Sequence, residues 1–197
     1  NKSVAEIDRA VSVSVKTIVM DSLFEIERVA AAAKKHGVRQ AVMLRLTPGI
    51  EAHTHEKIST AHEDVKFGFS IASGAAWAAV EAVATHPELE LRGVHCHIGS
   101  QIFGSEAHEI ATDRLMGFMA KYRDAYGAEL PELDLGGGFG ISYVHGDVTV
   151  EPADVLPQIH AAVKKACSTY NLAMPLVSLE PGPVSYTHLT LPTKRIV

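Results

Sequence analysis

The feature that most constrains the fold is a regular alternation of short β-rich runs with amphipathic helical stretches. Strands are predicted at residues 17–21, 41–46, 91–98, 133–135 and 176–180, and helices at 22–36, 73–86, 107–126 and 152–170. Strands that are separated by helical crossovers pair in parallel. The alternation therefore predicts an α/β fold with a parallel sheet. Five consecutive units favour part of a TIM-type (β/α)8 barrel, with a doubly wound sheet as the competing architecture.

Size, charge and cysteine content exclude several classes of protein. A chain of 197 residues that is 47% apolar can bury one sizeable core. Its net charge of -5, without a Lys/Arg block, disfavours a nucleic-acid partner. No apolar run approaches the roughly 20 residues that a membrane span needs, so no membrane partner is expected. Cys96 and Cys167 are too few for a disulfide scaffold, which favours a cytoplasmic setting.

Polar side chains gather where the predicted strands end. They are Asp21, Arg45, His95, His97, the glycines from Gly136 onward, and Glu180. The carboxyl ends of parallel strands meet at one edge of the sheet, which is where ligands bind in both open α/β sheets and barrels. Residues 48–69, a long polar stretch that contains histidines, are expected to form a functional loop at this edge.

The glycine run that follows the fourth predicted strand is the strongest local signal. Gly136, Gly137 and Gly138 lack a Cβ, so their backbone N–H groups can converge on an anion such as phosphate. The spacing does not match the dinucleotide-binding G-x-G-x-x-G, and no lysine follows as in a P-loop. A phosphate site is therefore predicted, and a flexible turn is the alternative.

His95 and His97 flank Cys96, and strand alternation would put both imidazoles on one face. Such a pair can ligate a metal or form a ring-stacking platform. A metal would need ligands from later strands, which end in glycines and in one acid, Glu180, so no metal is predicted. Glu180 needs a cationic or protonated partner unless it caps a helix. Arg45 could instead be a salt-bridged core residue, and Asp21, which precedes Ser22, could instead help to cap the following helix.

Several motifs resemble, in order and spacing, those of the diaminopimelate decarboxylases. These are fold-type III, pyridoxal-phosphate-dependent basic amino-acid decarboxylases with an alanine-racemase-like barrel. The motifs are DSLFE at 21–25, KFG at 66–68, GVHCHIGSQ at 93–101, DLGGGFG at 134–140 and EPG at 180–182. HCHIGSQ is the most specific of them. The segments 51–56 and 63–68 are similar to the diaminopimelate branch rather than to the ornithine or arginine branches.

The resemblance implies roles for individual residues. His97 would stack on the ring of the cofactor pyridoxal 5'-phosphate, and Glu180 would pair with the pyridine nitrogen; these two are the expected catalytic residues. The other expected cofactor-binding residues are Asp21, Arg45, Ser100, Gly136, Gly137, Gly138 and Gly182. A carboxylate at the pyridine nitrogen keeps it protonated, and the resulting pyridinium acts as an electron sink.

The implied reaction converts meso-diaminopimelate, a small-molecule amino acid, to L-lysine and CO2. Three alternatives stay open at this stage. An ornithine, arginine or carboxynorspermidine decarboxylase would share the fold, and a non-catalytic pyridoxal-phosphate carrier would share the barrel. A metal-dependent hydrolase is the remaining alternative, from a different class of enzyme.

The sequence also departs from the family pattern. The family's cofactor-binding lysine precedes the motifs found here, so it is expected upstream of residue 1, and the chain alone is expected to be inactive. The C-terminal β-domain, which completes the partner's site in the expected homodimer, has no counterpart. Pro183 stands where the family has arginine, and residues 183–197 resemble read-through of a sequencing adaptor. We therefore divide the chain into a partial barrel, 1–182, and a non-native tail, 183–197.

Overall fold

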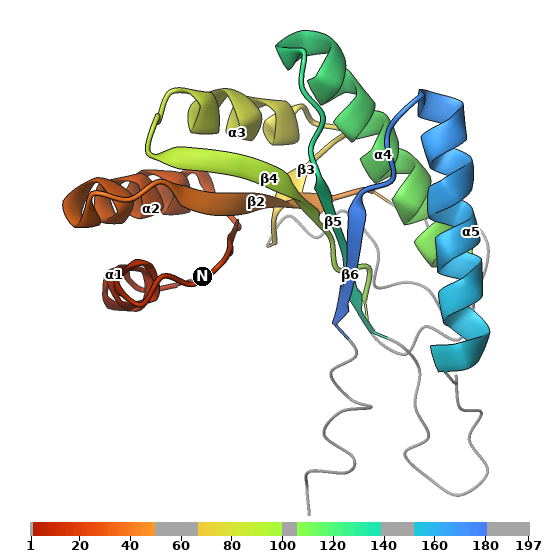
Figure 1. The fold of residues 1–197 in the computed structure, drawn as a ribbon, viewed down its shortest axis with the longest axis horizontal. Coiled ribbons are helices and arrows are strands. Elements are labelled where there is room, and N and C mark those ends of the chain that lie inside the picture. Colours follow the sequence, from red (N-terminus) through yellow and green to blue (C-terminus); the bar gives the residue numbers. More distant parts are fainter. Residues whose placement is uncertain (1, 50–66, 100–105, 139–151, 181–197) are drawn as a thin grey trace, which may run out of the picture.

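The computed structural model describes residues 2–49, 67–99, 106–138 and 152–180, and it is drawn in Figure 1. The helices are α1 (Val4–Ser12), α2 (Leu23–His36), α3 (Ala75–Ala84), α4 (Glu106–Tyr126) and α5 (Pro152–Tyr170). The strands are β1 (Ile18–Met20), β2 (Gln40–Thr47), β3 (Phe69–Ser70), β4 (Leu89–His95), β5 (Glu132–Gly137) and β6 (Leu176–Glu180).

The strands form one parallel sheet in the order β1-β2-β4-β5-β6, and β3 pairs with the end of β2. Apart from β3, each strand lies beside the one that precedes it along the chain. A doubly wound sheet reverses its order at a switch point, and the described strands contain no such reversal. The order is therefore that of consecutive barrel units.

The first crossover shows why the helices begin and end where they do. Ser22 caps α2, because its side-chain oxygen accepts a hydrogen bond from the Glu25 N–H. Gly37 ends the helix in the left-handed region, at φ 63°, where a residue without a Cβ carries no steric penalty. The helix predicted over 22–36 is thus confirmed.

The core lies between the sheet and the helices that cover it (Figure 1). Fully buried apolar side chains from the strands meet those from the helices; they include Val42, Leu44, Val94, Leu133, Ile26, Val29, Leu115 and Val163. The helices also pack on one another, α1 on α2 and α4 on α5. None of the described helices combines the length and apolar character that a membrane crossing requires.

The structure corrects the expected elements in three places. Helix α1 was not expected, and β3 lies at the end of the stretch 48–69 that was read as a loop. Strand β4 ends at His95, whereas the sequence predicted a strand to residue 98. The ladder stops there because β5 turns at Gly136, whose φ is 67° and whose backbone runs directly against the Cys96 carbonyl.

Candidate active site

The polar residues at the strand ends form a row across the sheet. Arg45 of β2 is in register with His95 of β4, and His95 is in register with Asp134 of β5. Asp21 follows Met20, which pairs with Leu44, so it lies level with Arg45. In-register residues of a parallel sheet project from the same face. The sheet therefore places these four side chains in a line along one face.

Asp21 and Arg45 form an ion pair at the start of this row. The Arg45 Nη1 lies 3.8 Å from the Asp21 Oδ1, and the side chains are only 25% and 10% exposed. The Arg45 guanidinium also lies over the ring of Phe67, 5.0 Å from its centroid. Both residues were expected beside a cofactor, with a salt-bridged core arginine as the alternative for Arg45 and a helix cap as the alternative for Asp21. The geometry shows that they contact each other, and Ser22 is the residue that caps α2.

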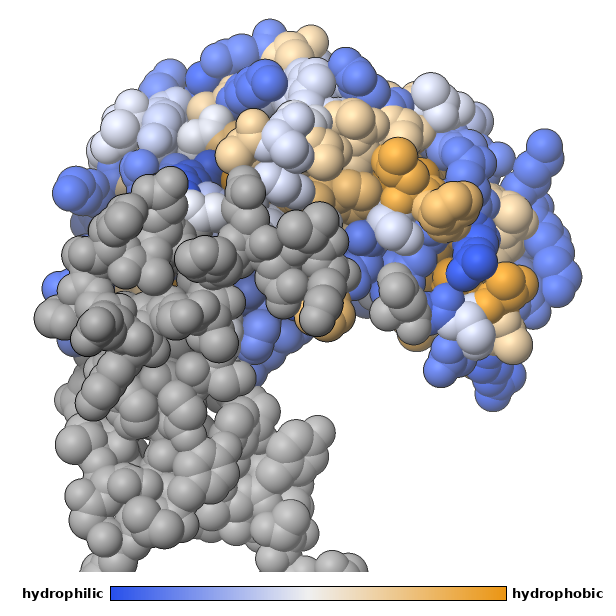
Figure 2. Space-filling model, turned by 180° about the vertical axis from the view of Figure 1, so that it is seen from behind, coloured by the Kyte–Doolittle hydropathy of each residue, from blue (hydrophilic) through white to orange (hydrophobic). Residues whose placement is uncertain are grey.

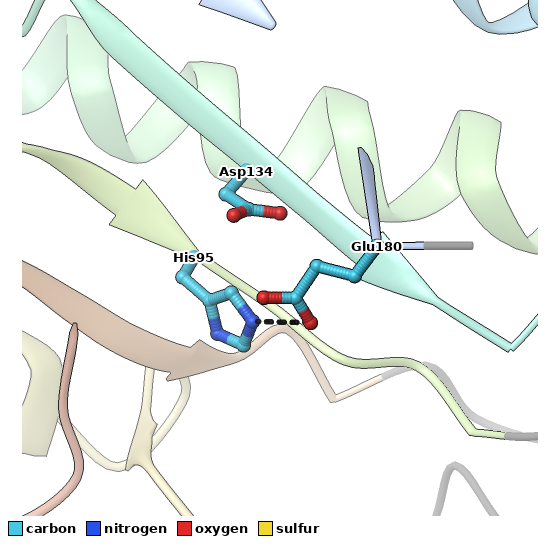
Figure 3. Close-up of side chains that lie close together, drawn as sticks. All are labelled: His95, Asp134 and Glu180. Carbon is cyan, nitrogen blue, oxygen red and sulfur yellow. Dashed lines mark ion pairs between the residues drawn. The ribbon is translucent and has the colours of Figure 1, made fainter. Parts of the chain in front are cut away.

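His95, Asp134 and Glu180 form a second cluster, drawn in Figure 3. One ligand atom from each of the three lies within 4.8 Å of the others, and the His95 Nε2 is 3.6 Å from the Glu180 Oε2. The His95 side chain is buried, whereas the Glu180 side chain is 55% exposed. The carboxylate of Glu180 is therefore accessible to a ligand, while its partner imidazole is enclosed by protein.

The electrostatics of the cluster centre on Asp134. Burial raises the pKa of its carboxyl, and the nearby Glu180 carboxylate acts in the same direction. A hydrogen bond of 2.8 Å from the Gly136 N–H and the proximity of His95 oppose this rise. Asp134 therefore connects the glycine turn with the His95 and Glu180 pair.

The glycine turn lies where it was predicted, but the N–H of its first glycine, Gly136, binds a side chain of the protein. Gly136 and Gly138 have φ values of 67° and 93°, and a Cβ on Gly136 would collide with the Cys96 carbonyl. The Gly136 N–H donates to Asp134, so that amide is already engaged. For Gly137 and Gly138, the other two described glycines of the turn, binding of a phosphate by the backbone N–H groups stays a prediction.

His97 lies just beyond β4 and is exposed. Its pKa is lowered, because neighbouring protein atoms replace water around the ring and because Arg45 and His95 add positive charge. Cys96 is fully buried, and burial raises the pKa of its thiol to about 12. A neutral, accessible imidazole suits contact with an aromatic ring, whereas the thiol is inert.

Two expected site residues, Ser100 and Gly182, lie outside the described residues, as do the histidines at 53, 55 and 62. Lys2 has partners outside the row, since its Nζ donates to the Val19 carbonyl and pairs with Glu25. Sequence reasoning omitted Asp134 and left the part played by His95 open. The available signal was a charged residue between Leu133 and Leu135, both fully buried.

Comparisons with known proteins identify the family that this chain resembles in sequence. Residues 1–186 match the family model described as "Pyridoxal-dependent decarboxylase, pyridoxal binding domain". The diaminopimelate decarboxylase of Mycobacterium tuberculosis is 46% identical over 186 residues, and that of Bacillus subtilis is 39% identical over 182 residues. Each alignment covers 92% of this chain but 42% of the relative, so the chain spans less than half the length of these proteins.

Solved structures show the same likeness. A crystal structure of diaminopimelate decarboxylase from M. jannaschii in co-complex with L-lysine has a TM-score of 0.79 at 29% identity. The Helicobacter pylori diaminopimelate decarboxylase complexed with L-lysine has a TM-score of 0.75 at 28% identity. These alignments cover 92% of this chain and 41% and 43% of the two neighbours. The expected fold class, part of an α/β barrel, is confirmed.

Proposed function

Because the chain belongs to the family of pyridoxal-dependent decarboxylases, through their pyridoxal binding domain, we propose that it is the cofactor-binding part of a diaminopimelate decarboxylase. The proposed reaction converts meso-diaminopimelate to L-lysine and CO2. The observation that carries the proposal is the accessible Glu180 carboxylate, which lies at the same sheet edge as His97 and the glycine turn.

The donor set of the site suits pyridoxal phosphate. The cofactor has a basic pyridine nitrogen, a flat ring and a phosphate, which call for a carboxylate, a ring contact and backbone N–H groups. Glu180 is half exposed, His97 is exposed, and the turn at Gly136 to Gly138 bears no side chains that would obstruct an anion. Asp21 and Arg45 contact each other, so they frame the site rather than offer a free charge.

The residues of this chain have distinct tasks in the proposed reaction. Glu180 accepts the hydrogen bond of the protonated pyridine nitrogen and so holds the proton there. His97 contacts the ring, and its lowered pKa keeps the imidazole neutral. Gly137 and Gly138 bind the phosphate through backbone N–H groups. When bound, pyridoxal phosphate supplies an electron sink for the charge left on the substrate carbon as CO2 departs.

The substrate, the assembly and the compartment are parts of the same proposal. The substrate is supported by the names of the relatives and by the two neighbours complexed with L-lysine, the product of the proposed reaction. The homodimer and the cytoplasmic location are supported by resemblance to the family.

We also propose that residues 183–197 are a non-native tail, and the family match ends at residue 186, short of Val197. An independent long read of the locus tests the tail.

The decisive experiment replaces Glu180 in a full-length enzyme that contains this chain. Glu180→Gln keeps the shape of the side chain but removes the charge that holds the pyridine nitrogen protonated. Turnover, followed as CO2 release from meso-diaminopimelate, should fall by roughly two orders of magnitude, equivalent to a loss of about 3 kcal/mol of transition-state stabilisation. Affinity for pyridoxal phosphate, titrated by absorbance, should change far less, because the phosphate contacts persist.

Glu27→Gln is the matched control, because Glu27 is an exposed carboxylate that pairs with His86 outside the site. Its turnover should equal that of the wild type. Near-wild-type turnover of Glu180→Gln would contradict the electron-sink role. Activity restored by zinc and not by pyridoxal phosphate would instead favour a metal at His95, Asp134 and Glu180, whose ligand atoms are close enough for one.

A further inference from the structure

His95 has no role in the proposed function as derived so far, yet it is the enclosed member of the cluster. It is 6% exposed, and its Nε2 faces the Glu180 carboxylate at 3.6 Å (Figure 3). Its Nδ1 is buried and has no hydrogen-bond partner among the residues that the structure describes. Burying a polar ring at a sheet edge costs free energy, so its position calls for a compensating interaction.

The charges around His95 show what that interaction is. Asp134 on β5 and Glu180 on β6 are two carboxylates close enough to repel each other. On the other side of His95, Arg45 of β2 forms an ion pair with Asp21 and not with Asp134 or Glu180. Two further titratable neighbours lie on the same segment as His95: Cys96 is buried, and His97 is exposed. Among the described residues, His95 is thus the buried side chain that lies against this carboxylate pair.

We infer that His95 is a positioning residue for Glu180, holding its carboxylate in place for the pyridine nitrogen of the cofactor. Asp134 serves the same arrangement from the other side, because it receives the Gly136 N–H and so joins the cluster to the glycine turn. This inference rests on the proposed function, since it assigns Glu180 the role given above.

The inference predicts a shift of the pH profile in one direction, which a purely structural role of His95 does not predict. His95 acts to lower the pKa of the Asp134 carboxyl, whereas burial and the Glu180 carboxylate raise it. Without His95, the Asp134 and Glu180 pair therefore retains a proton at a higher pH than in the wild type, and a pair that carries a proton holds the protonated pyridine nitrogen less well. The acid limb of the pH profile should therefore move to higher pH.

The experiment uses the full-length enzyme with His95→Asn, Glu180→Gln and both substitutions. Two readouts are taken across pH: turnover, and affinity for pyridoxal phosphate by absorbance titration. His95→Asn should move the acid limb of both upward by about half a pH unit, the size expected for a partly exposed ion pair. In the Glu180→Gln background, His95→Asn should produce no such shift, because no carboxylate of residue 180 is then left for His95 to position.

His86→Asn is the matched control, because His86 also pairs with a glutamate, Glu27, at 3.2 Å but away from the site. It should leave both profiles unchanged. His95→Gln, which fills more of the ring volume, serves as a second variant and should show the same shift as His95→Asn. An equal shift in the Glu180→Gln background, or no shift in either variant, overturns the inference. Wild-type turnover of Glu180→Gln alone overturns the proposed function instead.

Discussion

The two cysteines occupy very different surroundings, and this difference is testable residue by residue. Burial raises the pKa of Cys96 to about 12, and its side chain is fully enclosed. Cys167 is only partly buried, although burial also raises the pKa of its thiol. The thiolate is the nucleophile in thiol chemistry. At pH 8 the Cys96 thiol therefore stays in its neutral form.

We therefore expect iodoacetamide to label Cys167 well before Cys96 under native conditions at pH 8. Mass spectrometry of the digested protein measures the two rates. In urea, where burial is lost, both thiols should react at similar rates, which serves as the control. Native labelling of Cys96 as fast as that of Cys167 would contradict the buried position of the Cys96 side chain.

The glycine turn at the end of β5 carries a prediction at the scale of a single element. Gly136 has a φ of 67°, and a Cβ there would meet the Cys96 carbonyl. Gly37 has nearly the same φ, 63°, but a Cβ there would meet nothing within 4 Å. The two positions share a positive φ and differ in the space around them.

Gly136→Ala should therefore lower the free energy of unfolding by about 2 kcal/mol or more, whereas Gly37→Ala should lower it by about 1 kcal/mol. Thermal unfolding of the cofactor-free, full-length enzyme measures both variants. Equal destabilisation would show that the left-handed backbone alone accounts for the loss, and that β5 does not approach Cys96 closely. The same turn receives the phosphate in the proposed function, so Gly136→Ala should also weaken affinity for pyridoxal phosphate.

The elements also show what sequence reasoning can and cannot reach. Helix α5 and strand β6 have the predicted bounds, and in α5 the apolar periodicity coincides with the buried side chains of Val155, Ile159 and Val163. The end of β4 was placed three residues too late, because the ladder ends where the neighbouring strand β5 turns at Gly136. Asp134 was missed for the same reason, since its proximity to His95 depends on the register between β4 and β5. Periodicity within one segment carries no information on such register.

At the scale of the whole molecule, the sheet has two edges in the described structure, β1 and β6. Strand β6 is the more exposed of the two, and Leu176 at its start is 58% exposed. Apolar side chains also show on the surface among polar ones (Figure 2). An edge strand offers unpaired backbone N–H and C=O groups, and exposed apolar residues beside them favour pairing with another copy.

We expect the 197-residue chain, expressed alone, to aggregate through this edge. Leu176→Lys should reduce the aggregation several-fold, because a charged side chain on an edge strand opposes the approach of a second copy. Leu156→Lys is the matched control, since Leu156 is a similarly exposed leucine, at 46%, that lies on helix α5 rather than at a sheet edge. Light scattering at fixed concentration measures all three proteins. A soluble monomer with a sharp cooperative melt would contradict assembly through β6. Equal protection by both lysines would contradict it as well, because surface hydrophobicity alone would then account for the aggregation.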